Sequence, residues 1–322
     1  MSSVRLFRAP PSRRDDEGYR AAERAVWTLR GLEPQERWVE VPELGIRVRA
    51  MVHGQGRPVV FVHGNPTAGG VFVPLVAALD GVQAIVVDRP GCGLSDPLDY
   101  SQMSARELRD AIEAYLVAVI DQLAGGRADL VGNSAGGMAV LAFAARRPER
   151  VRSIVIEGVP SVEGMRLSWP MRAVTLPPVT AAVQRHRVTE RDLRASFRTM
   201  GHGGIIDTPR LPKIDLEWRV AVARLTDTFP NDLALLERAA TVRGPRRHWA
   251  AELLELAAVK APALWLVGDQ DPFLPRAGVE PWVARMRDAT LHMLIGCGHQ
   301  PWLDDPDWHA EAIGAWWRSL DA

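Results

Sequence analysis

The chain has 322 residues, of which 47% are hydrophobic, so it is long and apolar enough to bury a large core. Its 39 basic and 39 acidic residues give a formal net charge of zero, which supplies no field to recruit nucleic acid or an anionic membrane. No stretch approaches the roughly 18 to 20 apolar residues of a transmembrane helix, and no signal-peptide core follows the N-terminal arginines, so we predict a cytoplasmic protein.

The N-terminal region is predicted to contain a tail, a helix and a pair of strands. Residues 1–15 are rich in arginine, proline and serine, which favours a mobile tail. Apolar residues recur at helical spacing over 16–29, so a leading helix follows, and residues 1–35 together would precede the main domain. Two strand-like segments, 38–41 and 46–52, are expected to pair antiparallel.

Strand-like and helix-like segments then alternate along the chain. Apolar runs typical of buried strands occur at 59–62, 84–87, 128–131, 151–156, 264–268 and 291–295. Helical patterns lie near 70–79 and over 104–123 and 135–147. This alternation is typical of βαβ units, so we predict a mostly parallel sheet flanked by helices.

The alternation stops between residues 161 and 258. Prolines divide this segment, and no strong period-2 pattern runs through it, so we interpret it as a helical cap. Its aromatic residues would either line a pocket or pack the cap together; they are Trp169, Phe197, Trp218, Phe229 and Trp249.

A G-x-S-x-G pentapeptide, Gly132-Asn133-Ser134-Ala135-Gly136, follows one apolar strand and precedes one helical pattern. Glycines on both sides of Ser134 permit a turn tight enough to lift the hydroxyl above the sheet edge. Ser134 would then lie at a helix N-terminus, where the Ala135 N–H has no partner within the helix and can donate to an oxyanion. We therefore predict that Ser134 is a nucleophile.

A serine nucleophile needs a base, and the base needs an acid to orient it. His299 ends a late strand in a Gly-Cys-Gly-His loop and is the predicted base. Asp271 follows the strand before it and is the preferred acid, although Asp269 in the same loop and Glu157 after an earlier strand compete for this role. The chain order Ser, Asp, His is that of the α/β-hydrolases.

Two further loops strengthen the resemblance to the α/β-hydrolase superfamily. His63-Gly64-Asn65-Pro66 is similar to the HGxP loop, and Asp88-Arg89-Pro90-Gly91-Cys92-Gly93-Leu94-Ser95 is similar to the D-x-P-G-x-G-x-S loop. The resemblance implies an α/β-hydrolase fold with an eight-stranded, mostly parallel sheet and a cap inserted after strand 6. It assigns the core to 36–160 and 259–322, the cap to 161–258, and the second oxyanion donor to the Asn65 N–H.

Within the superfamily, the chain resembles serine esterases and carboxylesterases. Haloalkane dehalogenases and epoxide hydrolases carry similar HGNP and DRPGxG loops, but they use an aspartate where this chain has Ser134. We therefore expect hydrolysis of a carboxylic ester or lactone of a small to medium apolar substrate through an acyl-enzyme. The alternatives are a C–C bond hydrolase of the meta-cleavage type and a non-hydrolytic ligand receptor or biosynthetic cyclase on the same fold.

Trp302, Trp169 and Phe197 are candidates for contact with the substrate. We predict no cofactor and no metal, since no histidine and carboxylate residues have ligand spacing, and we expect a monomer or homodimer whose partner is a small-molecule substrate. Cys92 and Cys297 are expected to remain free thiols, because two cysteines in separate loops cannot build a disulfide framework.

Overall fold

The computed structural model describes residues 14–322. The predicted tail falls almost entirely outside these residues. The predicted leading helix is confirmed as α1 (Asp16–Thr28), and the Asp15 carboxylate caps it by accepting a hydrogen bond from the Gly18 N–H at 2.9 Å. None of the helices within residues 14–322 is long and apolar enough to cross a membrane.

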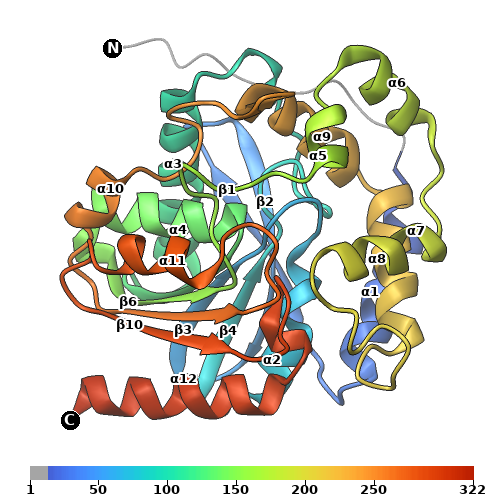
Figure 1. The fold of residues 1–322 in the computed structure, drawn as a ribbon. Coiled ribbons are helices and arrows are strands. Elements are labelled where there is room, and N and C mark those ends of the chain that lie inside the picture. The colour runs from blue at the N-terminus through green and yellow to red at the C-terminus, as the bar shows by residue number, and fades with distance from the viewer. Residues whose placement is uncertain (1–13) are drawn as a thin grey trace.

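Eight strands form one sheet (Figure 1). They are β1 (Gln35–Val41), β2 (Ile46–Gly54), β3 (Arg57–Val62), β4 (Val82–Val87), β5 (Ala128–Asn133), β6 (Val151–Glu157), β9 (Ala263–Gly268) and β10 (Ala289–Leu294). Their order is β1-β2-β4-β3-β5-β6-β9-β10; β2 pairs antiparallel with both β1 and β4, and the other pairs are parallel. The predicted mostly parallel, eight-stranded sheet is confirmed, although the last strand ends at Leu294 rather than Ile295.

Helices cover both faces of the sheet. One face packs against α1, α2 (Val73–Ala78) and α12 (Pro306–Asp321), and the other against α3 (Ala105–Leu123), α4 (Ala135–Arg146) and α11 (Arg276–Val283). Successive strand side chains point to opposite faces, so Val59 and Phe61 join one core cluster while Val60 and Val62 join the other. Single-turn helices are η1 (Gly69–Phe72), η2 (Tyr100–Gln102), η3 (Pro148–Arg150) and η4 (Pro301–Leu303).

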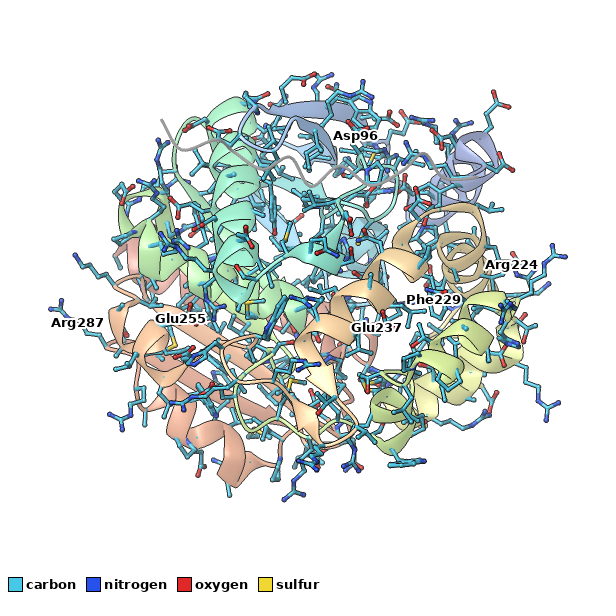
Figure 2. All side chains as sticks on the ribbon, turned by 90° about the horizontal axis from the view of Figure 1, so that it is seen from above. Asp96, Arg224, Phe229, Glu237, Glu255 and Arg287 are labelled. Atoms are coloured by element: carbon cyan, nitrogen blue, oxygen red, sulfur yellow. The ribbon has the colours of Figure 1, made fainter. Side chains whose placement is uncertain are left out.

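The segment predicted to be a cap is mostly helical. It contains α5 (Trp169–Ala173), α6 (Pro177–Arg185), α7 (Glu190–Thr199), α8 (Lys213–Leu225), α9 (Thr228–Ala239) and α10 (Leu253–Ala258), with a short ladder of β7 (Ala240–Thr241) and β8 (Gly244–Pro245). Figure 2 shows Arg224 of α8 and Phe229 of α9 on the side of the molecule opposite Arg287. The two ends of the segment meet where Val162 pairs with Ala251, and α10 then packs on α4 of the core.

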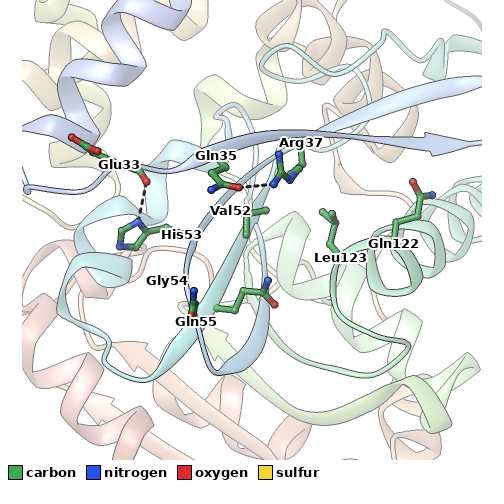
Figure 3. Close-up of a pocket in the computed structure, with 10 residues that line it drawn as sticks. Glu33, Gln35, Arg37, Val52, His53, Gly54, Gln55, Gln122 and Leu123 are labelled. Carbon is green, nitrogen blue, oxygen red and sulfur yellow. Dashed lines mark hydrogen bonds between the residues drawn. The ribbon is translucent and has the colours of Figure 1, made fainter.

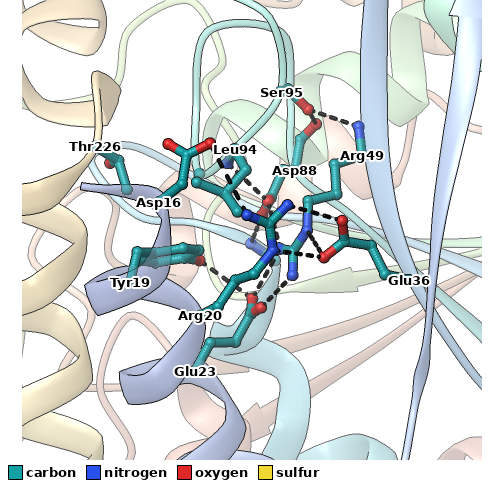
Figure 4. Close-up of polar contacts among 12 residues, drawn as sticks. Asp16, Tyr19, Arg20, Glu23, Glu36, Arg49, Asp88, Leu94, Ser95 and Thr226 are labelled. Carbon is teal, nitrogen blue, oxygen red and sulfur yellow. Dashed lines mark hydrogen bonds and ion pairs between the residues drawn. The ribbon is translucent and has the colours of Figure 1, made fainter. Parts of the chain in front are cut away.

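A buried group of charges fixes the loop that follows β4 (Figure 4). The guanidinium group of Arg49 on β2 lies 2.5 Å from a Glu23 carboxylate oxygen, 3.1 Å from Glu36 and 3.0 Å from Asp88. Asp88 also accepts a hydrogen bond from the Gly69 N–H at 2.9 Å. Because Glu23, Glu36 and Asp88 come from α1, β1 and the loop after β4, this group ties three segments together next to the carboxyl end of β3.

Candidate active site

Ser134 occupies the turn between β5 and α4. Its backbone has φ 54° and ψ −118°, a left-handed conformation that is uncommon for a residue with a side chain. A Cβ atom at Gly132 would lie 2.7 Å from the Gly136 carbonyl oxygen, and one at Gly136 would collide with the Val62 carbonyl oxygen. The two glycines therefore allow the tight turn that the pentapeptide predicts.

The HGNP loop lies directly against Ser134. A Cβ atom at Gly64 would stand only 2.7 Å from the Cβ atom of Ser134. The buried His63 ring holds this loop, because its Nδ1 lies 2.8 Å from the Gly64 carbonyl oxygen and its Nε2 accepts from the Arg89 N–H at 3.0 Å. Burial, reinforced by the charge of Arg89, lowers the pKa of His63 well below its ordinary value, so the ring stays neutral with its proton on Nδ1.

Two backbone N–H groups lie in the segments that flank Ser134. Ala135 is the first residue of α4, so its N–H has no acceptor within the helix. Asn65 follows Gly64 and precedes Pro66, which has no N–H. Within residues 14–322, the structure gives the Asn65 N–H no hydrogen-bond acceptor. Both groups are available to donate to an oxygen beside Ser134.

His299 and Asp271 form a buried pair. The His299 Nδ1 lies 2.7 Å from Asp271 Oδ2, and the Asp271 side chain is fully inaccessible to solvent. The same carboxylate accepts from the Val159 N–H at 2.9 Å and from the Phe273 N–H at 3.0 Å. Because the proton on Nδ1 faces Asp271, the His299 Nε2 is left with a lone pair and can accept a proton.

The loop of His299 is joined to the loop of Ser134 by a single side chain. The Asn133 Nδ2 donates to the His299 carbonyl oxygen at 3.0 Å and to the Glu157 carbonyl oxygen at 2.6 Å. In addition, the Ser161 N–H donates to the Ser134 carbonyl oxygen at 3.0 Å. Ser134, Asp271 and His299, the three predicted residues, therefore follow the carboxyl ends of β5, β9 and β10 at the same edge of the sheet.

The two competing carboxylates have other partners. Glu157 Oε2 lies 3.0 Å from the His309 Nδ1, and both side chains are buried. Asp269 is exposed and accepts from the Gly296 N–H at 2.7 Å. Of the three candidate acids, Asp271 is the one that contacts His299.

The candidate substrate contacts have different surroundings. Trp302 is fully buried, donates its indole N–H to the Val71 carbonyl oxygen and stacks on Phe72 with ring centroids 4.7 Å apart. These contacts belong to the packing of the core. Trp169 is 62% exposed on α5, whereas the buried Phe197 lies close to the loop of His299 through its neighbour His202.

His202, which the sequence analysis did not single out, holds the loop of His299 from the cap side. Its Nε2 accepts from the Gln300 N–H at 3.0 Å, and its Nδ1 lies 3.0 Å from Asp304 Oδ2. Asp304 also accepts from the Gly298 N–H at 2.9 Å, and the Met200 carbonyl oxygen accepts from the His299 N–H at 2.9 Å. No local pattern relates His202 to Asp304, because 102 positions separate them in the chain.

The cap also holds the loop after β4. The buried Arg89 guanidinium group lies 3.0 Å from Asp232 on α9 and donates to the Gly64 carbonyl oxygen at 3.2 Å. The Gly93 N–H donates to the Thr228 hydroxyl at 2.8 Å. In the same region Cys92 is buried, and both it and Cys297 are free thiols, as expected.

A surface pocket and a group of possible metal ligands both lie away from Ser134, Asp271 and His299. A pocket of about 530 Å³ is lined by His53 and Gly54 of β2 and by Gln83 at the amino end of β4, and Figure 3 shows His53 and Gly54 in it. Because Ser134 follows the carboxyl end of the parallel strand β5, this pocket opens at the opposite edge of the sheet. Within residues 14–322, one group of possible metal ligands gathers within 4.8 Å, and none of its members is a predicted site residue; they are Glu163, His248 and Glu252.

Comparisons with known proteins agree with this fold. The model of the Alpha/beta hydrolase family matches residues 59–312. The chain is 30% identical over 271 residues to a cis-3-alkyl-4-alkyloxetan-2-one decarboxylase of Shewanella oneidensis, covering 79% of this chain and 80% of that protein. It is 30% identical over 274 residues to a pimeloyl-[acyl-carrier protein] methyl ester esterase of Xanthomonas campestris, covering 81% of this chain and 95% of that protein.

A third relative is the 2-hydroxy-6-oxononadienedioate/2-hydroxy-6-oxononatrienedioate hydrolase of Burkholderia vietnamiensis, which is 28% identical over 280 residues, covering 82% of this chain and 88% of that protein. Among solved structures, the naproxen esterase of Bacillus subtilis superposes with a TM-score of 0.70 at 16% identity, covering 95% of this chain and 100% of that chain. At that identity the superposition supports the fold.

Proposed function

This chain belongs to the alpha/beta hydrolase family, and we propose that it is a serine hydrolase that cleaves a carboxylic ester or lactone through an acyl-enzyme. The observation that carries the proposal is the 2.7 Å contact between His299 and Asp271, in a loop that Asn133 ties to the Ser134 turn. A carboxylate, an imidazole and a hydroxyl at one edge of the sheet are the groups that acyl transfer requires.

The proposed reaction has two half-cycles, and His299 accepts and then returns a proton in each of them. Ser134 Oγ attacks the carbonyl carbon while His299 Nε2 takes the hydroxyl proton, and the N–H groups of Asn65 and Ala135 stabilise the oxyanion. His299 then gives the proton to the leaving alcohol. In the second half-cycle, water loses a proton to His299 and attacks the acyl-enzyme, which releases the acid and restores Ser134. Asp271 keeps the imidazole in the productive tautomer and stabilises the imidazolium.

The named relatives support an ester or lactone as the substrate. One of them is an esterase by name, and the name of another describes an oxetan-2-one, which is a four-membered cyclic ester. The segment 161–258 contributes aromatic side chains such as Phe197 and Trp218, and we propose small to medium, largely apolar acyl groups. A panel of p-nitrophenyl esters of graded length together with lactones of different ring size would define the preference.

Labelling by a fluorophosphonate probe tests whether Ser134 is an activated nucleophile. We expect the wild-type protein to be labelled in minutes, because only a serine paired with a base reacts with such a probe at a useful rate. Ser134→Ala should not be labelled. The matched control is Ser196→Ala, which alters an exposed hydroxyl on α7 and should be labelled like the wild type. Labelling of Ser134→Ala, or a folded wild-type protein that resists the probe, would argue against the mechanism.

A C–C bond hydrolase is the second candidate, because the Burkholderia vietnamiensis relative acts on a hydroxy-oxo-dienedioate by name. Such an enzyme would use the same three residues. Turnover of 2-hydroxy-6-oxo-6-phenylhexa-2,4-dienoate, followed by loss of its absorbance, can be compared with turnover of p-nitrophenyl butyrate. We expect the ester to be the better substrate. A dienoate rate well above the ester rate would favour the second candidate.

Replacing His202, the cap residue that bonds the loop of His299, should lower kcat more than it changes KM. In His202→Phe the Gln300 N–H and the Asp304 carboxylate each lose a partner, so the loop that carries His299 is less well fixed. If the loss of these hydrogen bonds raises the activation free energy by about 1.4 kcal/mol, kcat falls tenfold. We expect kcat for p-nitrophenyl butyrate to fall about tenfold with little change in KM. His186→Phe, at an exposed cap position, is the control, and an unchanged kcat in His202→Phe would refute a positioning role.

A further inference from the structure

Deeply buried guanidinium groups in this protein generally face a carboxylate. Arg49 lies 2.5 Å from Glu23, and Arg89 lies 3.0 Å from Asp232. Arg219 on α8 is different, because no carboxylate oxygen within residues 14–322 lies within 4.0 Å of its guanidinium nitrogens. Its Nε is buried without any hydrogen-bond partner.

Arg219 lies where α8 meets the loop that carries the proposed catalytic base. Its Nη2 donates to the side-chain oxygen of Gln300 at 3.0 Å, and Gln300 directly follows His299. The guanidinium carbon lies 4.8 Å from the centre of the Phe197 ring and 5.6 Å from that of Trp218. The two aromatic rings orient the planar group without neutralising its charge.

The nearest carboxylate on the same helix is already engaged. Asp215 lies one turn before Arg219, and its two oxygens accept from the guanidinium group of Arg30 at 3.0 and 2.6 Å. Burial lowers the pKa of Arg219 to about 10, and the charge of Asp215 opposes this shift. The guanidinium group therefore remains protonated at neutral pH. Even a partly buried cation without a counter-charge costs free energy that a bound anion would recover.

Building on the serine-hydrolase function proposed above, we propose that Arg219 binds a carboxylate group of the substrate. A guanidinium group presents parallel N–H donors that match the two oxygens of a carboxylate. Arg219 is only partly buried as a residue, so its Nη groups can meet a ligand. The preferred substrate is then an ester whose apolar part contacts Phe197 and which carries a carboxylate, rather than an entirely apolar ester.

The test compares pairs of esters that differ only in charge. In the first pair, mono-p-nitrophenyl glutarate and its methyl-capped analogue, the carboxylate is on the acyl side. In the second pair, 4-acetoxybenzoate and its methyl ester, it is on the alcohol side. We expect the wild-type protein to prefer the charged member of one pair at least tenfold in kcat/KM.

Variants at position 219 separate charge recognition from a structural role. Arg219→Met should abolish the preference, because it should slow the charged esters at least tenfold more than their neutral analogues. Arg219→Lys should keep part of the preference, because it retains a cation, and it serves as the second variant should Arg219→Met fold poorly. Arg191→Met, which removes an exposed charge from α7, should keep the full preference.

Two results would overturn the proposal. One is a wild-type protein with no preference in either pair, and the other is an Arg219→Met variant that slows charged and neutral esters equally. Calorimetric titration of glutarate into Ser134→Ala, with and without Arg219→Met, measures the carboxylate site without turnover. Glutarate binding that depends on Arg219, in a protein that hydrolyses no ester, would contradict the proposed hydrolase function and leave the anion site standing.

Discussion

Replacing Ser134 by alanine is expected to lower kcat for p-nitrophenyl butyrate by about 10⁴- to 10⁶-fold, which is the range seen when one member of a working triad is removed. His299→Gln should cause a similar loss, because the hydroxyl then has no base. Steady-state rates check both results, and thermal melting checks that the variants remain folded. His292→Gln changes an exposed histidine on β10 and should retain the wild-type rate.

The double variant distinguishes a triad from two independent contributions. When two groups act as one unit, removal of the second has little further effect, so Ser134→Ala with His299→Gln should be about as slow as either single variant. Losses that multiply would mean that Ser134 and His299 contribute separately, and the proposed mechanism would then be wrong.

Replacing Asp271 by asparagine should lower kcat by about 10⁴-fold. The Asp271 carboxylate accepts from His299 at 2.7 Å and from the N–H groups of Val159 and Phe273. An amide has only one acceptor oxygen, so it cannot satisfy all three donors, and it cannot stabilise the imidazolium. The measurement is kcat together with the melting temperature, since the loss of a buried acceptor also reduces stability.

Asp269 and Glu157, the two other candidate acids, serve as controls for Asp271→Asn. Asp269→Asn should change kcat less than threefold, because Asp269 is exposed and contacts the Gly296 N–H. Glu157→Gln should lower the melting temperature through its buried partner His309, while kcat stays within about tenfold of the wild type. If Glu157→Gln is the crippling change and Asp271→Asn keeps most of the rate, the acid has been assigned to the wrong strand end.

The sequence is a good guide to this fold because its signals are local. Apolar runs predict the strands, and helical spacing predicts α1, α3 and α4 to within two residues at each end. The pentapeptide around Ser134 contains the two glycines, Gly132 and Gly136, that its tight turn requires. Each of these features depends on a short stretch of sequence, because residues close in the chain determine whether it forms a strand, a helix or a tight turn.

The remaining features depend on contacts between distant positions. The sequence leaves three acids open, and only the folded chain shows Asp271 beside His299. Trp302 is close to His299 in sequence, but its indole packs on Phe72, far earlier in the chain. The pairing of His202 with Asp304 and the lack of a carboxylate beside Arg219 are likewise invisible in a single sequence, because tertiary packing sets them.

The hydrogen bonds from Met200 and His202 to the loop of His299 restrict which parts of the cap can be replaced, by engineering or in evolution, without loss of activity. A chimaera that took its whole cap from a relative would exchange specificity, but it would also remove the acceptors of the His299 and Gln300 N–H groups. The donor cap would have to arrive with a compatible segment at 298–304. Exchanges that leave residues 197–202 and α9 in place, and vary α5 and α6, keep these bonds and the Arg89–Asp232 contact intact and are the safer route to new substrates.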